Sequence, residues 1–344
     1  MHDPSLQPSL KPMLGRLTRE LPRGDFLYEP KWDGFRCLAF RSGGEIDLRS
    51  RHGRPLARYF PELVEGLRAL PRRRLVIDAE IVAEAGFPAL MSRLHPAASR
   101  VERLRREVPA ALICFDLLAL GGDDLLAYPF SERRRLLEEL LADASEPIRL
   151  TPATSDPELA EQWLDGFDDG GIDGVMAKPL DMAYEPGART MLKVKRERTA
   201  DCVLAGVRLF PDREALSSLM LGLHDDEGRL EHVGVVTSFR EARRVELLDE
   251  LAALVTSLEG HPWEHGFLVG GSPVGRLPGA AGRWTPGEMT QDWVPLAPER
   301  VVEVAYDHVD FDRFRHPARF KRWRQRLPPS GRRSRMKSSR RRCR

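Results

Sequence analysis

Short apolar runs separated by turns dominate the chain from Asp25 onward, and they constrain the fold more than any other feature. Runs of this length, rich in β-branched and aromatic residues, predict strands rather than long helices. The predicted strands of the first half cover residues 35–41, 45–51, 74–84, 111–120, 171–179 and 190–196.

Three segments with helical spacing interrupt these strands, at residues 60–70, 131–144 and 156–167. Ser131 is predicted to cap the second helix, and Pro157 suits the first turn of the third. Strands and helices that alternate in this way predict an α+β domain of mixed antiparallel sheets with helices.

The pattern changes near residues 197–201, where strands without long crossover helices begin. Several short strands with one helix predict a small OB-fold β-barrel, the oligonucleotide-binding type. Its predicted elements are strands 201–210, 217–225, 230–239 and 300–309, helix 239–260 and a long loop at 270–290. The predicted domains are residues 1–199 and 200–328, followed by a basic, disordered tail at 329–344.

Composition narrows the class of protein. A chain of 344 residues is too long for one ordinary core, which favours two domains. No apolar run approaches the roughly 20 residues of a membrane span, and the N-terminus lacks a signal-peptide core. We therefore expect a cytoplasmic protein without a membrane partner. The four cysteines are scattered and form no CxxC pair, which disfavours structural zinc and a disulfide framework.

The net charge is only +2, but arginine and lysine crowd residues 313–344. Such a tail is either a solvated appendage or a source of salt-dependent affinity for nucleic acid, and both interpretations stay open.

The strongest local signal is EPKWDGFR at residues 29–36. A lysine attacks phosphorus well only when its amine is neutral, and burial or neighbouring cations lower its pKa toward that state. Lys31 is therefore a candidate nucleophile. Taken alone, the motif favours an exposed lysine beside a DG turn over a nucleophile.

Other charged residues lie within predicted strands. Asp78 and Glu80 share one strand face, where burial without partners is costly. Lys193 and Lys195 also share a face, and two like charges there favour a bound phosphate between them. Phe115 is by default a core residue, although a base-stacking aromatic fits as well.

Taken in order, these elements resemble the collinear motifs of the covalent nucleotidyltransferases, which include DNA ligases, RNA ligases and mRNA-capping enzymes. The matching motifs are KWDGFR (31–36), SR (50–51), DAE (78–80), FD (115–116), DGVMAK (173–178) and KVK (193–195). Together with PML (12–14) and RFRHPARFKRWR (313–324), the run is similar to the small accessory ATP-dependent DNA ligases of bacteria and to the ligase module of bacterial end-joining enzymes.

The resemblance implies an adenylation domain that carries AMP on Lys31 after attack on the α-phosphate of ATP. It implies that Glu29 recognises the adenine amine and that Phe115 stacks on the ring. Arg36 and Arg51 would hold the ribose and, later, the 5′-phosphate of the nick.

The resemblance also implies a divalent metal, Mg²⁺ or Mn²⁺, positioned by Glu80 and Asp173. Lys193 and Lys195 would neutralise the α-phosphate as charge builds. The barrel would close over ATP through a basic final motif and then grip DNA. Its matching positions are Arg315, Lys321, Arg322 and Arg324.

Three positions depart from the family pattern. Ala79 replaces the glycine of the usual DGE, which matters if that position needs a positive φ. Asp173 stands where glutamate is usual, which favours metal contact through water. The final motif lacks its usual acid and lysine after Arg324, which affects the expected efficiency of adenylation.

The implied function is sealing of nicks with 3′-OH and 5′-phosphate ends in DNA repair, recombination or backup end joining. Implied partners are nicked double-stranded DNA and end-joining factors such as Ku or a polymerase, with a monomeric enzyme near the nucleoid. The alternatives are an RNA ligase, another covalent nucleotidyltransferase, or a nucleic-acid-binding protein with a decayed active site.

Overall fold

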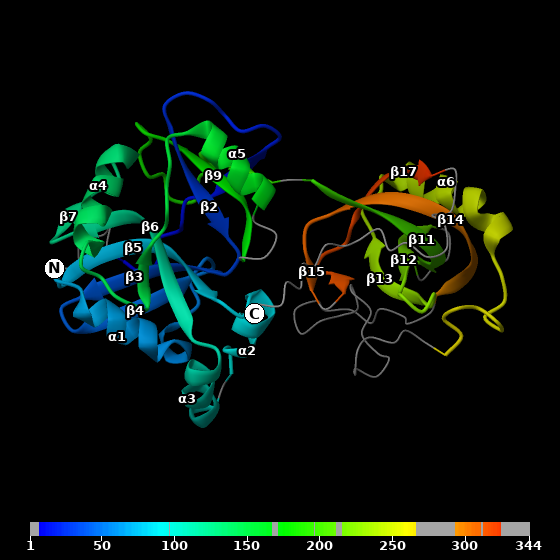
Figure 1. Cartoon of the computed structure of the whole chain (residues 1–344), viewed down its shortest axis with the longest axis horizontal. Helices are drawn as coiled ribbons and strands as arrows, with labels where there is room; N and C mark the ends of the chain where they lie inside the picture. Colours follow the sequence, from blue (N-terminus) through cyan, green and yellow to red (C-terminus); the bar gives the residue numbers. More distant parts are fainter. Residues whose placement is uncertain are drawn as a thin grey trace. The chain divides into compact units, whose positions relative to one another are not determined.

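The computed structural model describes residues 7–95, 97–166, 171–195, 197–210, 215–265, 293–310 and 312–324. These residues divide into two compact units, one within Met1–Arg196 and the other within Glu197–Ser338 (Figure 1). The predicted loop at 270–290 and the predicted tail at 329–344 lie outside the described residues. None of the helices in the described segments is both long and apolar enough to cross a membrane.

The first unit is built on two sheets. In the six-stranded sheet the order is β4 (Glu45–Ser50), β3 (Phe35–Ser42), β5 (Arg74–Ala83), β6 (Ala110–Leu120) and β7 (Asp123–Asp124), and β8 (Ile148–Leu150) runs parallel to β6. In the four-stranded sheet the order is β1 (Gly15–Thr18), β10 (Met191–Val194), β9 (Ile172–Pro179) and β2 (Phe26–Trp32).

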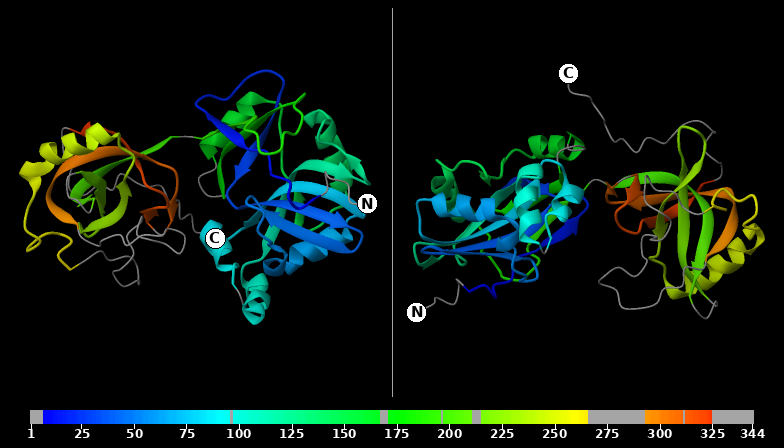
Figure 2. Two further views of the ribbon diagram at one scale, coloured as in Figure 1. Left: turned by 180° about the vertical axis from the view of Figure 1, so that it is seen from behind. Right: turned by 90° about the horizontal axis from the view of Figure 1, so that it is seen from below.

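The first unit consists of layers of helices and sheets with apolar residues packed between them. Figure 2 shows its elements from two further sides. Helices α1 (Pro61–Ala69) and α4 (Phe130–Leu141) bury their leucines against one face of the six-stranded sheet. Helix α5 (Pro157–Gly166) packs Ala160 against Tyr28 of the four-stranded sheet. Residues from both sheets form a further cluster between them: Met13, Leu38, Phe40, Val76, Leu118, Tyr184 and Met191.

Two short helices that the periodicity did not predict, α2 (Phe87–Ser92) and α3 (Ala98–Glu107), follow β5. Arg93, which is fully buried, donates to Glu62 Oε1 at 2.6 Å and to Val108 O at 2.7 Å. This buried arginine anchors the two-helix insertion to the rest of the unit.

Two details of the predicted helices have clear outcomes. The prediction of Ser131 as an N-cap was wrong, because α4 begins at Phe130 with Pro129 at the N-cap position. The Ser131 N–H instead donates to Leu180 O at 2.8 Å. Helix α5 begins at Pro157, as predicted, because proline has no N–H to lose in the first turn.

The second unit contains a five-stranded sheet. Its order is β13 (Leu230–Val236), β12 (Leu216–His224), β11 (Arg198–Leu209), β14 (Val294–Tyr306) and β17 (Arg319–Arg324), and β15 (Val309–Asp310) pairs with β16 (Arg313–Phe314). A bridge between Val236 and Ala318 joins the end of β13 to the residue before β17, so the sheet curls toward a barrel of the predicted OB type. The helix predicted over 239–260 is shorter, because α6 (Glu241–Leu251) ends before a 3₁₀ turn.

Candidate active site

Lys31 lies next to the end of β2, where the backbone is irregular. The pairing of β2 with β9 shifts register between Pro30 and Trp32, and such bulges re-aim the side chain between them. The glycine of the DG turn that follows fits a tight space. A Cβ at Gly34 would lie 2.1 Å from Ile81 O, so only glycine lets this segment approach β5 so closely.

The Lys31 amine belongs to a cluster of lysines around one acid. Lys31 Nζ lies 2.5 Å from Asp173 Oδ1, and Lys195 Nζ lies 2.5 Å from Asp173 Oδ2. The Asp173 side chain is 6% exposed, whereas the lysines are 23% and 24% exposed. Asp173 therefore holds both amines at the edge of solvent, where a phosphate can reach them.

Lys193 extends this cluster. Burial lowers the pKa of Lys193 from its usual value, and the charges of Lys31 and Lys195 lower it further. Strand β10 ends at Val194, so the predicted strand 190–196 was too long and Lys195 lies just beyond it. Three lysines therefore surround one carboxylate, and the anion site between Lys193 and Lys195 stays a prediction.

Glu80 faces this cluster from β5 of the other sheet. It pairs in register with Arg36 of β3. Burial raises the pKa of Glu80 to about 7, although the charges of Arg36 and Lys31 act in the opposite direction. A carboxylate that titrates near neutral pH, close to a candidate nucleophile, is typical of functional sites.

Asp78, two residues before Glu80, is the partner of Arg36. Arg36 donates from Nε to Asp78 Oδ1 at 2.5 Å and from Nη2 to Asp78 Oδ2 at 2.6 Å. Arg36 Nη2 also donates to Met13 O at 3.2 Å, and the guanidinium carbon lies 4.5 Å from the centroid of the Phe115 ring. This fork fixes the plane of the guanidinium at the predicted base-stacking ring.

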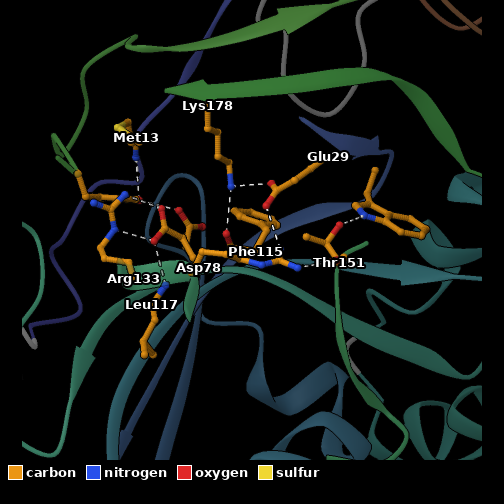
Figure 3. A network of polar contacts seen from close by, with 12 residues as sticks. Met13, Glu29, Asp78, Phe115, Leu117, Arg133, Thr151 and Lys178 are labelled. Atoms are coloured by element: carbon orange, nitrogen blue, oxygen red, sulfur yellow. Dashed lines mark hydrogen bonds and ion pairs between the residues drawn. The ribbon is translucent and has the colours of Figure 1, made fainter. Parts of the chain in front are cut away.

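The predicted adenine-binding residues lie together in a buried polar network (Figure 3). Glu29 is 2% exposed, and its carboxylate pairs with Lys178 at 2.6 Å and with Arg134 at 3.1 Å. Lys178 Nζ also donates to Phe115 O at 3.0 Å and lies 4.7 Å from the centroid of the Phe115 ring. Glu29 and Phe115 therefore both contact Lys178.

Some residues of the network were not predicted as site residues. Arg134 donates to Thr151 O as well as to Glu29, and its neighbour Arg133 forms a fully buried pair with Asp116 at 2.8 Å. Both arginines lie on the buried face of α4, among leucines. Charged residues at apolar positions of a helix are a signal in the sequence that could have found them. Tyr184, whose hydroxyl contacts Asp78, is an uncharged residue in a loop, and no pattern in the sequence marks it.

Arg51, a predicted ribose and phosphate ligand, lies exposed in the turn after β4. Among the described residues it takes no part in the network around Lys31 and Asp78. Ala79 is one of the departures from the family pattern. Among the described residues other than glycine, only Asp312 has a positive φ, so the φ of Ala79 is negative. A glycine is therefore not required at position 79.

The predicted final motif lies in the second unit, where three of its cations pair with acids. Lys321 Nζ lies 2.7 Å from Glu197 Oε2. The backbone N–H of Arg315 donates to His308 O at 2.9 Å. Arg324 pairs with Asp201 at 2.9 Å, and Arg322 pairs with Glu303 at 2.6 Å. The segment after Arg324 lies outside the described residues.

The residues predicted to position a metal are acids of the first unit, Glu80 and Asp173. Within the described segments, no three His, Cys, Asp or Glu side chains gather as a ready-made metal cage. Mg²⁺ is usually bound through one or two carboxylates together with substrate phosphates, and two acids beside a phosphate-attracting lysine cluster fit that chemistry.

Comparisons with known proteins identify the family of the chain. The family model "ATP dependent DNA ligase domain" matches residues 8–195, and "ATP dependent DNA ligase C terminal region" matches residues 212–326. DNA ligase C2 of Mycolicibacterium smegmatis is 51% identical over 324 residues, which are 92% of this chain and 91% of that protein. DNA ligase C of Mycobacterium tuberculosis is 47% identical over 328 residues, covering 93% and 91%.

A solved structure from a study of Lig E DNA ligases has a TM-score of 0.55 at 16% identity, covers 91% of this chain and 99% of its own, and supports the fold alone. The fold is that of a nucleotidyltransferase domain followed by an OB barrel. The chain belongs to the family of ATP-dependent DNA ligases.

Proposed function

We propose that this ligase seals nicks in double-stranded DNA through an adenylate carried on Lys31. The observation that carries the proposal is the contact of Lys31 and Lys195 with the same buried carboxylate of Asp173. This arrangement supports the proposal, because phosphoryl transfer to nitrogen requires a lysine amine beside groups that attract a phosphate.

In the first step the neutral Lys31 amine attacks the α-phosphorus of ATP. A P–N bond forms, the P–O bond to pyrophosphate breaks, and the nitrogen passes its proton to solvent, which reaches the partly exposed Lys31 side chain. Lys193 and Lys195 stabilise the negative charge that grows on the phosphate oxygens. Asp173 must release Lys31 for this attack, and it can keep its second contact with Lys195.

The adenine is held by Glu29 and Phe115. A carboxylate has about four acceptor sites. The contacts of Glu29 with Lys178 and Arg134 leave others for an adenine amine. Arg36, fixed by Asp78, holds the ribose, and Arg51 joins the site through the later contact with the 5′-phosphate of the nick.

Glu80 and Asp173 are the residues that would hold Mg²⁺ or Mn²⁺. When bound, such an ion neutralises phosphate charge and orients the leaving group. Ionised Glu80 is required for this, and its pKa of about 7 makes the ionisation sensitive to pH near neutrality.

The next steps transfer AMP from Lys31 to the 5′-phosphate of the nick and then join the 3′-OH to that phosphate with release of AMP. Residues 1–199 act as the adenylation domain, and residues 200–328 act as the DNA-gripping barrel through Arg315, Lys321, Arg322 and Arg324. The enzyme works as a monomer near the nucleoid in repair or backup end joining, beside factors such as Ku or a polymerase.

The test is to incubate the protein with ATP labelled on the α-phosphate and Mg²⁺, and to follow label on the denatured protein. We expect covalent label that nicked DNA chases into sealed product. Lys31→Arg, which keeps a positive charge beside Asp173, should not be labelled, whereas Lys11→Ala, which removes an exposed lysine, should be labelled normally. Labelling of Lys31→Arg at the wild-type level would overturn the proposal.

A further inference from the structure

Tyr184 lies between β9 and β10, outside every motif predicted from the sequence, and is 3% exposed. Its hydroxyl donates to Asp78 Oδ2 at 2.6 Å and accepts from the Met13 N–H at 2.9 Å. Because the hydroxyl has one proton and both contacts are made, its orientation is fixed.

Asp78 is the residue through which this hydroxyl can act on the active site. Its side chain is fully buried, and Oδ2 accepts from both Tyr184 and Arg36 Nη2. The other oxygen accepts from Arg36 Nε at 2.5 Å. The tyrosine therefore holds the carboxylate that in turn holds both prongs of the arginine fork.

Met13 closes the arrangement into a ring of contacts. Its N–H binds Tyr184, and its carbonyl accepts from Arg36 Nη2 at 3.2 Å. Met13 and Asp78, both labelled in Figure 3, come from separate segments of the chain. Arg36 donates to the Asp78 carboxylate and to the Met13 carbonyl. The Tyr184 hydroxyl therefore contacts both residues that accept from Arg36.

We infer that Tyr184 is a positioning residue, whose hydroxyl fixes the Arg36 guanidinium against Phe115. The functional part of this inference rests on the proposed role of Arg36 in holding nucleotide. Without the hydroxyl, Asp78 Oδ2 loses a donor and the Met13 N–H loses its acceptor in a buried place. The carboxylate can then rotate about its last side-chain bond, and the fork loses its fixed plane.

Packing alone would give Tyr184 a different role. Its ring belongs to the apolar cluster between the two sheets, and a phenylalanine would fill that space equally well. Tyr184→Phe therefore separates the hydroxyl from the ring. The matched control is Tyr28→Phe, because Tyr28 is also a buried residue but its hydroxyl donates to Pro22 O at 2.7 Å, away from Asp78.

The activity test measures the rate of covalent adenylation at saturating ATP for Tyr184→Phe, Arg36→Lys and the double variant. Loss of a hydrogen bond to a charged group predicts about a tenfold slower rate for Tyr184→Phe. In the Arg36→Lys background the same change should cost about twofold or less, because the two residues act through one contact. Equal losses in both backgrounds, or no loss in the wild-type background, would overturn the inference.

A second test does not depend on ligase activity, so it separates this inference from the proposed function. In protein with ¹⁵N-labelled arginine, solvent exchange of the Arg36 Nε proton is measured by NMR. We expect exchange about tenfold faster in Tyr184→Phe and unchanged in Tyr28→Phe, since an Asp78 carboxylate without the tyrosine contact holds the Nε proton less firmly. Unchanged exchange in Tyr184→Phe would refute the inference, even if wild-type protein is adenylated normally.

Discussion

The ion pairs around the predicted site residues lie in different environments in the two units. In the first unit Asp116 and Arg133 are both buried and bond to each other through two contacts, at 2.8 and 3.0 Å. In the second unit Lys321 and Glu197 pair at 2.7 Å, but their side chains are 39% and 46% exposed. The same kind of ion pair therefore occurs in two very different environments.

A buried pair has no water to replace a lost partner, so removing one member is expensive and the geometry stays fixed. An exposed pair contributes little and can be exchanged for another anion at small cost. The first unit thus presents a rigid site to the nucleotide. In the proposed function, the second unit offers cations that can leave the exposed acids Glu197 and Asp201 for DNA phosphates.

The largest expected effect comes from breaking a buried pair. Asp116→Ala leaves Arg133 buried without its carboxylate, and we expect a loss of about 3–5 kcal/mol in the free energy of unfolding of the first unit. Urea unfolding followed by circular dichroism measures it. Glu132→Ala, which removes an exposed partner of Arg135 on the same helix, is the control and should change stability little. Equal small losses of unfolding free energy in both variants would contradict the difference between buried and exposed ion pairs.

The next effect concerns Glu80 and the adenylation rate. Because the pKa of Glu80 is raised to about 7, its ionised form is gained as pH rises through that value, and we expect the rate to rise with it. Glu80→Gln should lower the rate roughly 10- to 100-fold and remove this rising limb. If the adenylation rate of Glu80→Gln still rises with pH near 7, the group that titrates there is not Glu80.

Stability gives an independent check on the same carboxyl group. Its pKa lies above its usual 4.5 in the folded protein, so ionisation is less favourable there than in the unfolded chain. The stability contributed by the neutral acid is present at low pH and is lost as pH rises from about 4.5 through about 7. In Glu80→Gln this part of the pH dependence of unfolding should be absent.

The smallest effect is expected in the second unit. Lys321→Ala should leave stability nearly unchanged, weaken binding of nicked DNA two- to threefold, and reduce the slope of log affinity against log salt by about 1. Fluorescence anisotropy at several salt concentrations measures both quantities. Arg229→Ala, which removes a more exposed cation from the β12–β13 turn, should keep the slope. A large loss of stability in Lys321→Ala would show that the exposed pair with Glu197 stabilises the second unit, contrary to this expectation.

Much of the fold was predictable because strand periodicity is local. Strands β3, β5, β6 and β11 lie close to where the short apolar runs predicted them, and α5 begins at its proline. The lysine cluster was also predictable, since Lys193 and Lys195 are close in sequence. Tertiary pairing was not. Nothing near Tyr184 in the sequence indicates a contact with Asp78, which is 106 residues away. The helix over 239–260 was overextended because its apolar residues continue into the 3₁₀ turn.

The central claim is that Lys31 carries the adenylate, and mass mapping of the modified residue tests it most directly. The protein is incubated with ATP and Mg²⁺ without DNA, digested, and the peptides are sequenced by tandem mass spectrometry. We predict AMP on the peptide that contains Lys31 and its loss after nicked DNA is added. AMP on Lys193, Lys195 or Lys178 instead, or no adduct on protein that seals DNA, would contradict the account.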